Sequence, residues 1–223
     1  MSGRKKAAIT TLTRERIVRT ALEIVDRQGL AALSMRRLGA ELGVDPMAAY
    51  YHIPNKEALF DAIVEAVMAE IDLGGDDPSA PPEERILWAA MAYRDVMLAH
   101  ANALPIVLSR GPSTPEAIRP VELLIGILRA AGLSPTQAMA GMNAIAATAR
   151  GTVAMVADDA GEPPTPDHLT ALADRFPAEE FPNLHEASLC SPDFVGAGFE
   201  FGIRALARGL LASVAEPTAS TTQ

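Results

Sequence analysis

The sequence predicts an all-α fold, because three kinds of observation agree. Apolar residues recur at intervals of three and four in most segments, and no segment alternates apolar and polar residues as a strand would. Capping side chains followed directly by proline mark several helix starts, namely Thr114-Pro115, Ser134-Pro135, Thr165-Pro166 and Ser191-Pro192. Since proline is favoured at the first helical position after a cap, each pair indicates where a helix begins.

Four short helices are expected in the first third of the chain, over residues 14–28, 35–42, 46–52 and 56–71. The side chains expected to cap them are Thr13, Ser34, Asp45 and Asn55. Gly43 follows the second helix, where a tight turn requires the left-handed backbone that glycine adopts without strain. Pro54 cannot continue the third helix and ends it.

The rest of the chain also reads as helices, after a linker rich in glycine and proline at 72–82. Helices are expected over residues 82–100, 103–109, 115–131, 135–158, 167–175 and 193–214. Residues 159–192 are rich in proline and predict a long, partly mobile loop around one short helix. The last nine residues, 215–223, predict a disordered tail.

Charge is distributed unevenly along the chain. Residues 1–52 contain nine Lys or Arg and five Asp or Glu, whereas residues 53–223 contain ten and 23. A basic end on an acidic body is typical of a polyanion-binding module attached to another domain, although a solvated charged surface explains the same pattern. Residues 1–12 include Arg4, Lys5 and Lys6 and predict a basic, disordered arm that adds phosphate or minor-groove contacts.

Composition argues against several protein classes. No apolar run approaches the length of about 18 residues that spans a membrane, and no apolar stretch follows the basic start as in a signal peptide. The single cysteine, Cys190, can form no internal disulfide, so a cytoplasmic protein is expected. The sequence has no phosphate-cradling Gly-rich loop, no metal-spaced cluster and no nucleophile motif. We therefore expect no enzyme activity, no cofactor and no metal site.

The strongest functional signal is in residues 34–60. The side chains that can form a small core between the second and third helices are Leu38, Leu42, Val44 and Ala49. Gly39 is small where these helices would cross. This pattern predicts a helix-turn-helix, whose second helix enters the major groove of DNA. The alternative is an ordinary helical hairpin whose tyrosines and histidine pack locally.

Nine side chains of this segment are expected at DNA, namely Ser34, Arg36, Arg37, Met47, Ala48, Tyr50, Tyr51, His52 and Lys56. Hydroxyl groups, Lys56 and a helix N-terminus can reach phosphates. The planar guanidinium of Arg36 can reach a guanine edge, whereas Met47 and Ala48 offer only apolar contact, for example to a thymine methyl. Sequence preference is therefore expected to depend on Arg36 and on DNA shape.

Residues 13–60 closely resemble the DNA-binding domain of the tetracycline-repressor-like (TetR/AcrR) family. The matching elements are LTRERIVRTALEIVDRQGLAALSMRRLGAELGV and AAYYHIPNKEALFDAI. The segment FEFGIRALARGLLA is similar to the last helix of the subgroup nearest the tetracycline repressors. By this resemblance, Tyr51, His52 and Lys56 lie at the DNA backbone.

The resemblance implies a homodimer that places one helix-turn-helix on each half-site of a palindromic double-stranded operator. It also implies a small-molecule cavity in a C-terminal domain, here residues 72–214. The helices 135–158 and 193–214 would form the dimer interface, since both are rich in Ala and Gly, which permits close approach; packing within one chain is the alternative. The expected function is a repressor released from DNA when ligand shifts helix 56–71. The alternative is control by a partner protein.

The ligand site is the least determined feature of the sequence. Candidates are Trp88, Met91, His100, Arg110, Met142, Asn143 and Arg150. The apolar members also suit an ordinary core, and a buried arginine needs either an anionic ligand group or an internal salt bridge. Tetracycline repressors bind a drug–magnesium complex, but the positions that align with its ligands hold Val107, Ala147 and Met155, none of which binds a metal.

Overall fold

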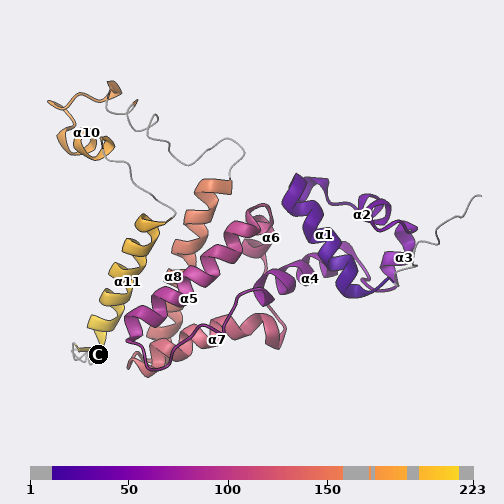
Figure 1. Cartoon of the computed structure of the whole chain (residues 1–223), viewed down its shortest axis with the longest axis horizontal. Helices are drawn as coiled ribbons and strands as arrows, with labels where there is room; N and C mark the ends of the chain where they lie inside the picture. The colour runs from indigo at the N-terminus through magenta and orange to yellow at the C-terminus, as the bar shows by residue number, and fades with distance from the viewer. Residues whose placement is uncertain (1–11, 158–170, 172–173, 190–195, 216–223) are drawn as a thin grey trace, which may run out of the picture.

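The computed structural model describes residues 12–157, 171, 174–189 and 196–215, and within these residues it contains helices and no strand (Figure 1). The α-helices are α1 (Arg14–Gln28), α2 (Met35–Leu42), α3 (Pro46–Tyr50), α4 (Lys56–Ala69), α5 (Pro82–Ala99), α6 (Leu104–Ser109), α7 (Pro115–Ala130), α8 (Pro135–Ala157), α10 (Pro182–Ser188) and α11 (Ala197–Ala215). Two 3-10 turns, η1 (Leu30–Ala32) and η2 (Ala101–Ala103), join neighbouring helices. The predicted all-α fold is confirmed, and none of the described helices is long and apolar enough to cross a membrane.

The four predicted caps of the N-terminal helices are all present. The side chain of Thr13 accepts a hydrogen bond from the amide of Arg16, and Ser34 does the same for Arg37, each at 3.2 Å. Asp45 caps α3 and Asn55 caps α4 by the same kind of bond. Because these bonds satisfy amides that have no partner inside the helix, they fix where each helix begins.

The tight contact between α2 and α3 depends on two glycines. Gly43 has φ of 69°, the left-handed conformation expected of the turn. A Cβ on Gly39 would lie 3.0 Å from the backbone N and Cα of Pro46, so the helices cross where only glycine fits without a shift. Leu38, Leu42 and Ala49 are buried beneath this crossing, which confirms the predicted small core.

Several helix bounds differ from the prediction. Helix α3 ends at Tyr50 rather than near His52, because the amides of His52 and Ile53 both bond back to the carbonyl of Ala49 and close a turn before Pro54. Helix α4 ends at Ala69 rather than Ile71, and α10 was missed. The residue before α10 is Phe181, which gives no side-chain cap, so the sequence lacks the usual start signal.

Some sequence predictions fall mainly outside the described residues. Of the helix expected at 167–175, only 171, 174 and 175 are described, and all three are helical. The basic residues Arg4, Lys5 and Lys6, the thiol of Cys190 and the tail after residue 215 are not described.

Helix α4 leads from the N-terminal helices into the C-terminal body, where α5, α7, α8 and α11 pack together (Figure 1). One hydrophobic cluster runs without a break from Ile24 of α1 through Val67 of α4 to Val107 of α6. A second cluster, with Leu128 and Ile203 near its centre, holds the body together. Since the first cluster extends from the N-terminal helices into the body, a movement of α4 changes the packing of the N-terminal helices and of the body.

His100, which follows α5, connects the body to two N-terminal elements. Its Nδ1 lies 2.9 Å from a carboxylate oxygen of Asp26 in α1, and its Nε2 lies 2.9 Å from Glu70 at the end of α4. Burial disfavours the charged imidazolium, but the hydrogen bonds to Glu70 and Asp26 outweigh that effect and raise the pKa of His100. The His100 side chain therefore remains protonated at pH values somewhat above the ordinary pKa of a histidine.

We expect this ion-pair bridge to stabilise the fold at lower pH. Because folding raises the pKa of His100, its contribution is fully present below about pH 6.5, the unfolded value, and is lost as pH rises through the folded value. His100→Gln should lower the free energy of unfolding by about 1–3 kcal/mol at pH 6 and by less at pH 9. Urea denaturation of both proteins across this range measures the difference, and parallel pH profiles would contradict the assignment.

Candidate DNA-binding surface and effector cavity

Helices α2 and α3, with the first turn of α4, place the predicted DNA contacts at one end of the molecule. Tyr51 is 90% exposed although it is a large aromatic residue, and Met47 of α3 is 64% exposed. His52 and Lys56 are also exposed, on the turn after α3 and at the start of α4. Contacts within the subunit do not bury these aromatic and apolar side chains, so they are available to a binding partner.

The arginines of α2 differ in how they are held. Arg37 lies 3.8 Å from Glu41, one helical turn later, and Glu41 also pairs with Arg27 of α1 at 2.8 Å. Arg36 is exposed and has no ion-pair partner among the described residues. The oxygen of Ser34 accepts a hydrogen bond from the amide of Arg37 and so caps α2. A phosphate at this position would contact both the Ser34 hydroxyl and the N-terminus of α2. Tyr50 is 37% exposed and Ala48 is half-buried, so both lie at the edge of this surface.

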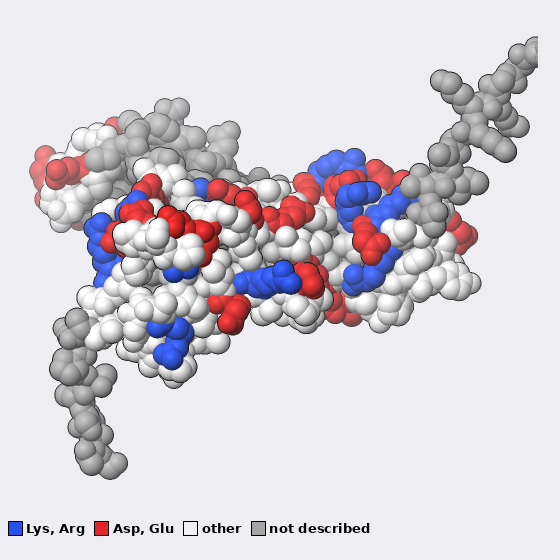
Figure 2. Space-filling model, turned by 60° about the horizontal axis from the view of Figure 1, so that its bottom comes forward, with Lys and Arg blue, Asp and Glu red and all other residues white. Residues whose placement is uncertain are grey.

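Charged side chains of both signs lie interleaved over the described surface. Figure 2 shows basic and acidic side chains next to one another both over the N-terminal helices and over the body. The interleaving reflects ion pairs, for example Arg204 with Glu84 at 2.6 Å and Arg85 with Asp76 at 2.7 Å. The body is therefore acidic in sum, but many of its carboxylates are paired locally.

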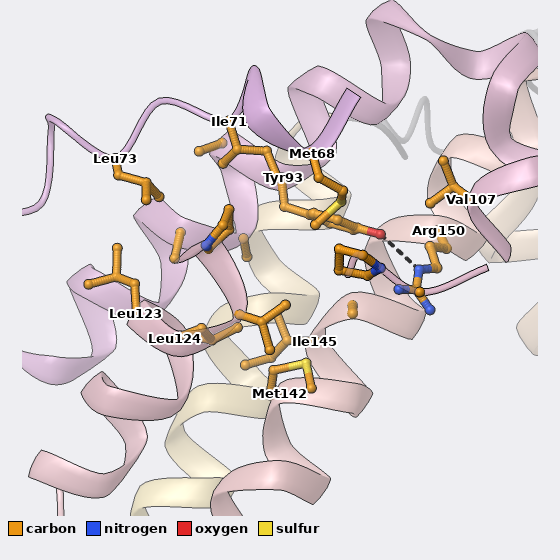
Figure 3. A pocket seen from close by; sticks show the side chains of 18 of the residues that line it. Met68, Ile71, Leu73, Tyr93, Val107, Leu123, Leu124, Met142, Ile145 and Arg150 are labelled. Carbon is orange, nitrogen blue, oxygen red and sulfur yellow. Dashed lines mark hydrogen bonds between the residues drawn. The ribbon is translucent and has the colours of Figure 1, made fainter. Parts of the chain in front are cut away.

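A cavity that is partly open to solvent lies between α4, α5, α7 and α8 (Figure 3). Its walls are mainly apolar, with Met68 and Ile71 from α4 and the following turn, Leu124 from α7 and Ile145 from α8. The described lining includes no carboxylate, imidazole or thiol, the side chains that hold metal ions, and thus does not fit a drug–magnesium complex.

The structure brings together four of the seven predicted ligand residues. Trp88, Arg110, Met142 and Arg150 line the cavity. Trp88 packs against Gly75, where a Cβ would lie 2.8 Å from its indole nitrogen, so this glycine leaves room for the ring.

The other three candidates lie outside the cavity. His100 is held by Asp26 and Glu70, Asn143 is exposed on α8, and Met91 packs against the second hydrophobic cluster. Tyr93 of α5 also lines the cavity, and its hydroxyl accepts a hydrogen bond from Arg150 at 2.8 Å. Helical spacing along α5 places Tyr93 on the same face as other apolar residues, but no sequence pattern indicates its hydrogen bond to Arg150 of α8.

Residues 110–112 form one wall of the cavity, and the segment 110–114 between α6 and α7 is attached to α4. Arg110 contacts two carboxylates of α4, with 2.5 Å from its Nη1 to Asp61 and a close bond from Nη2 to Glu57. Glu65 accepts hydrogen bonds from the amide and hydroxyl of Ser113 at 2.6 and 2.8 Å, and from Thr114. Burial opposes ionisation of Glu65, but these bonds outweigh it and lower its pKa.

Comparison with known proteins agrees with these features. Residues 17–63 match "Bacterial regulatory proteins, tetR family", and residues 77–214 match "Tetracyclin repressor-like, C-terminal domain". The tetracycline repressor protein class C of Escherichia coli is 30% identical over 207 residues, which cover 89% of this chain and 90% of the repressor.

Two solved structures of ActR from Streptomyces coelicolor are similar over almost the whole chain. The apo form has a TM-score of 0.76 and 31% identity, over 93% of this chain and 100% of ActR. The form in complex with actinorhodin has a TM-score of 0.78 and 28% identity, with the same coverage. This chain belongs to the TetR family of bacterial regulatory proteins, and it is a ligand-responsive, DNA-binding transcriptional regulator rather than an enzyme.

Proposed function

We propose that the protein is a homodimeric repressor that leaves a palindromic operator when a small molecule fills the cavity beside α4. The observation that carries this proposal is the position of the cavity. Its walls include Val64 and Met68 of α4, the helix that begins at Lys56 on the DNA-binding surface. Ligand contact with α4 can thus change the orientation of the helix-turn-helix.

The presence of this cavity favours a small molecule over the alternative, a partner protein that binds the surface. A concave, mainly apolar site with a few polar groups, here Arg150 and Tyr93, is typical of small-molecule binding sites. ActR, which has this fold, is found in complex with actinorhodin. We infer that the effector acts in the cytoplasm, where operator DNA is accessible.

We assign the dimer interface to the outer faces of α8 and α11, which contact one another in the body. Phe201 of α11 is 76% exposed and Met155 of α8 is 48% exposed. A Cβ on Gly151 or Gly209 would meet nothing within 4 Å, so packing within one subunit does not explain these glycines. Small residues around an exposed phenylalanine suit a helix pair approached closely by its symmetry mate.

Selection from a random pool of DNA duplexes tests the proposed function. We expect the protein to enrich a sequence with two-fold symmetry, and nuclease footprinting to show two protected half-sites about one helical turn apart. A thermal-shift screen of small molecules should then identify compounds that raise the melting temperature and release this DNA. Failure to enrich any sequence, or a footprint on a single half-site, would contradict the proposal.

Separate substitutions should distinguish residues that position the protein on DNA from the one that reads bases. Tyr51→Ala and Lys56→Ala should weaken binding to operator and random DNA alike. Because Lys56→Ala removes about one phosphate contact, it should also make DNA affinity fall less steeply with salt concentration. Arg36→Ala should cost about 1–3 kcal/mol on the operator and little on random DNA.

Titration of both DNA types at several salt concentrations measures these effects. Arg119→Ala serves as the control, because it removes the same charge from an exposed position on α7. Equal losses for all three variants would contradict the division of roles.

A further inference from the structure

We infer that the effector is an apolar, ring-based carboxylic acid whose carboxylate binds Arg150 and Tyr93. This inference rests on the proposed function, since it assumes that the cavity beside α4 holds the effector. It adds the chemical class of the ligand and the residues that select it.

Arg150 has an unusual environment for an arginine of this protein. Its Nε donates a hydrogen bond to the hydroxyl of Tyr93 at 2.8 Å, and its guanidinium carbon lies 5.8 Å from the centroid of that ring. Figure 3 shows the two side chains meeting from opposite walls, α8 and α5, at one end of the cavity. Among the described residues no carboxylate lies within ion-pair distance of Arg150.

The other described arginines of the body that are buried or half-buried are paired with carboxylates, whereas Arg119, Arg129 and Arg175 are exposed. Arg110, the other arginine of the cavity, contacts Asp61 and Glu57 of α4. Arg85 and Arg204 also have carboxylate partners. A half-buried guanidinium with no counter-charge costs free energy, and an anionic ligand removes that cost. Arg150, which lines the cavity and has no carboxylate partner among the described residues, is therefore suited to bind an anionic group of the ligand.

Hydrogen-bonding capacity at this end of the cavity favours an anion over a neutral polar group. The four remaining N–H groups of Arg150 and the O–H of Tyr93 are donors, while the Tyr93 oxygen already accepts a bond from Arg150. A carboxylate accepts two parallel bonds from a guanidinium and has no proton to donate, so its geometry fits. An amide of the same shape would bring an N–H toward donors.

The remainder of the cavity requires an apolar ligand body. Leu73, Leu123 and Leu124 lie at the end away from Arg150 (Figure 3). The described lining offers no other charged side chain than Arg110, which is already paired. Trp88 and Tyr93 present aromatic rings, which pack favourably against a ring system of the ligand. Ring-based acids combine both requirements in one molecule.

Fluorescence of Trp88 can test the inference directly, because it is the only tryptophan of the chain and it lines the cavity. The probes are anthracene-2-carboxylate and anthracene-2-carboxamide, which have nearly the same shape and differ in charge. In the wild-type protein we expect the carboxylate to quench Trp88 with a dissociation constant about tenfold to a hundredfold lower than the amide.

Four variants test which side chains cause the preference for the carboxylate. Arg150→Gln should remove it by weakening only the carboxylate, while Arg119→Gln, which removes the same charge outside the cavity, should keep it. Tyr93→Phe keeps the ring and should reduce the preference partly. Circular dichroism melting establishes that each variant is folded. If Arg150→Gln is unfolded, Arg150→Lys takes its place: it keeps the positive charge but lacks the planar guanidinium, and it should show an intermediate preference for the carboxylate.

Each outcome decides the inference. Equal binding of carboxylate and amide to the wild-type protein would overturn it, as would a preference that survives in Arg150→Gln. If the amide binds and releases operator DNA as well as the acid does, the cavity remains the effector site and only the ligand class is wrong. If neither probe quenches Trp88, the inference fails, and the thermal-shift screen decides the proposed function separately.

Discussion

Phe201→Glu should convert the proposed dimer into a monomer and lower operator affinity by about 10²–10⁴-fold, because the second half-site is then no longer bound intramolecularly. Phe201 is 76% exposed in one subunit, so the substitution leaves the monomer fold intact. Burial of one such side chain contributes about 1.5–3 kcal/mol, and a two-fold interface buries it twice. Glutamate replaces this contribution with the cost of two desolvated charges.

Sedimentation at micromolar concentration and operator titration measure the two effects together. Leu108→Glu is the matched control, since Leu108 is 56% exposed on α6, away from the faces of α8 and α11. A Phe201→Glu protein that stays dimeric would refute the assignment of the interface. If it becomes monomeric but keeps its operator affinity, the requirement for two half-sites is wrong.

Local chemistry explains why the DNA-binding end could be predicted well from sequence. The caps Thr13, Ser34 and Asn55 each bond an amide within three residues. Gly43 is required by its left-handed backbone and Gly39 by the close approach of Pro46. Short-range rules therefore give the start of each helix and the crossing of α2 and α3. They do not show which exposed residues touch bases, and those assignments stay predictions.

The effector cavity depends on contacts between distant segments, which no periodicity shows. Leu73, Tyr93 and Arg150 all line it although they are far apart in the chain. His100 was a reasonable candidate by residue type, but Asp26 and Glu70, remote in sequence, hold it elsewhere. Arg110 lines the cavity as predicted, yet its guanidinium contacts Glu57 and Asp61, which only the fold brings near.

These contacts of Arg110 suggest how the cavity communicates with DNA. Glu57, Asp61 and Glu65 are spaced one helical turn apart along α4, and all three bond to the segment 110–114, whose residues 110–112 line the cavity. The ring of Phe60 lies 5.5 Å from the Arg110 guanidinium and 5.2 Å from the Lys56 amine. A ligand that displaces this wall therefore acts on the first turn of α4, where Lys56 is expected at the DNA backbone.

The double substitution Glu57→Gln and Asp61→Asn should uncouple ligand binding from DNA release. Neither residue lines the cavity, but Arg110 does and loses both carboxylate partners, so effector affinity is measured separately from DNA release. Allosteric coupling typically changes affinity by about 5–150-fold, and we expect the ratio of operator affinities without and with effector to fall toward one. The ratio cancels any change in baseline DNA affinity caused by the two lost negative charges.

Operator titration with and without a compound from the thermal-shift screen measures this ratio, and calorimetry measures effector binding. Glu116→Gln with Glu122→Gln is the control, because both residues are exposed acids of α7 and the charge changes by the same amount. Full release of DNA from the Glu57 and Asp61 variant would show that coupling runs through other contacts, such as the wall formed by Val64 and Met68. Loss of release in the control as well would instead indicate a general effect of charge, because those two side chains do not hold the segment 110–114.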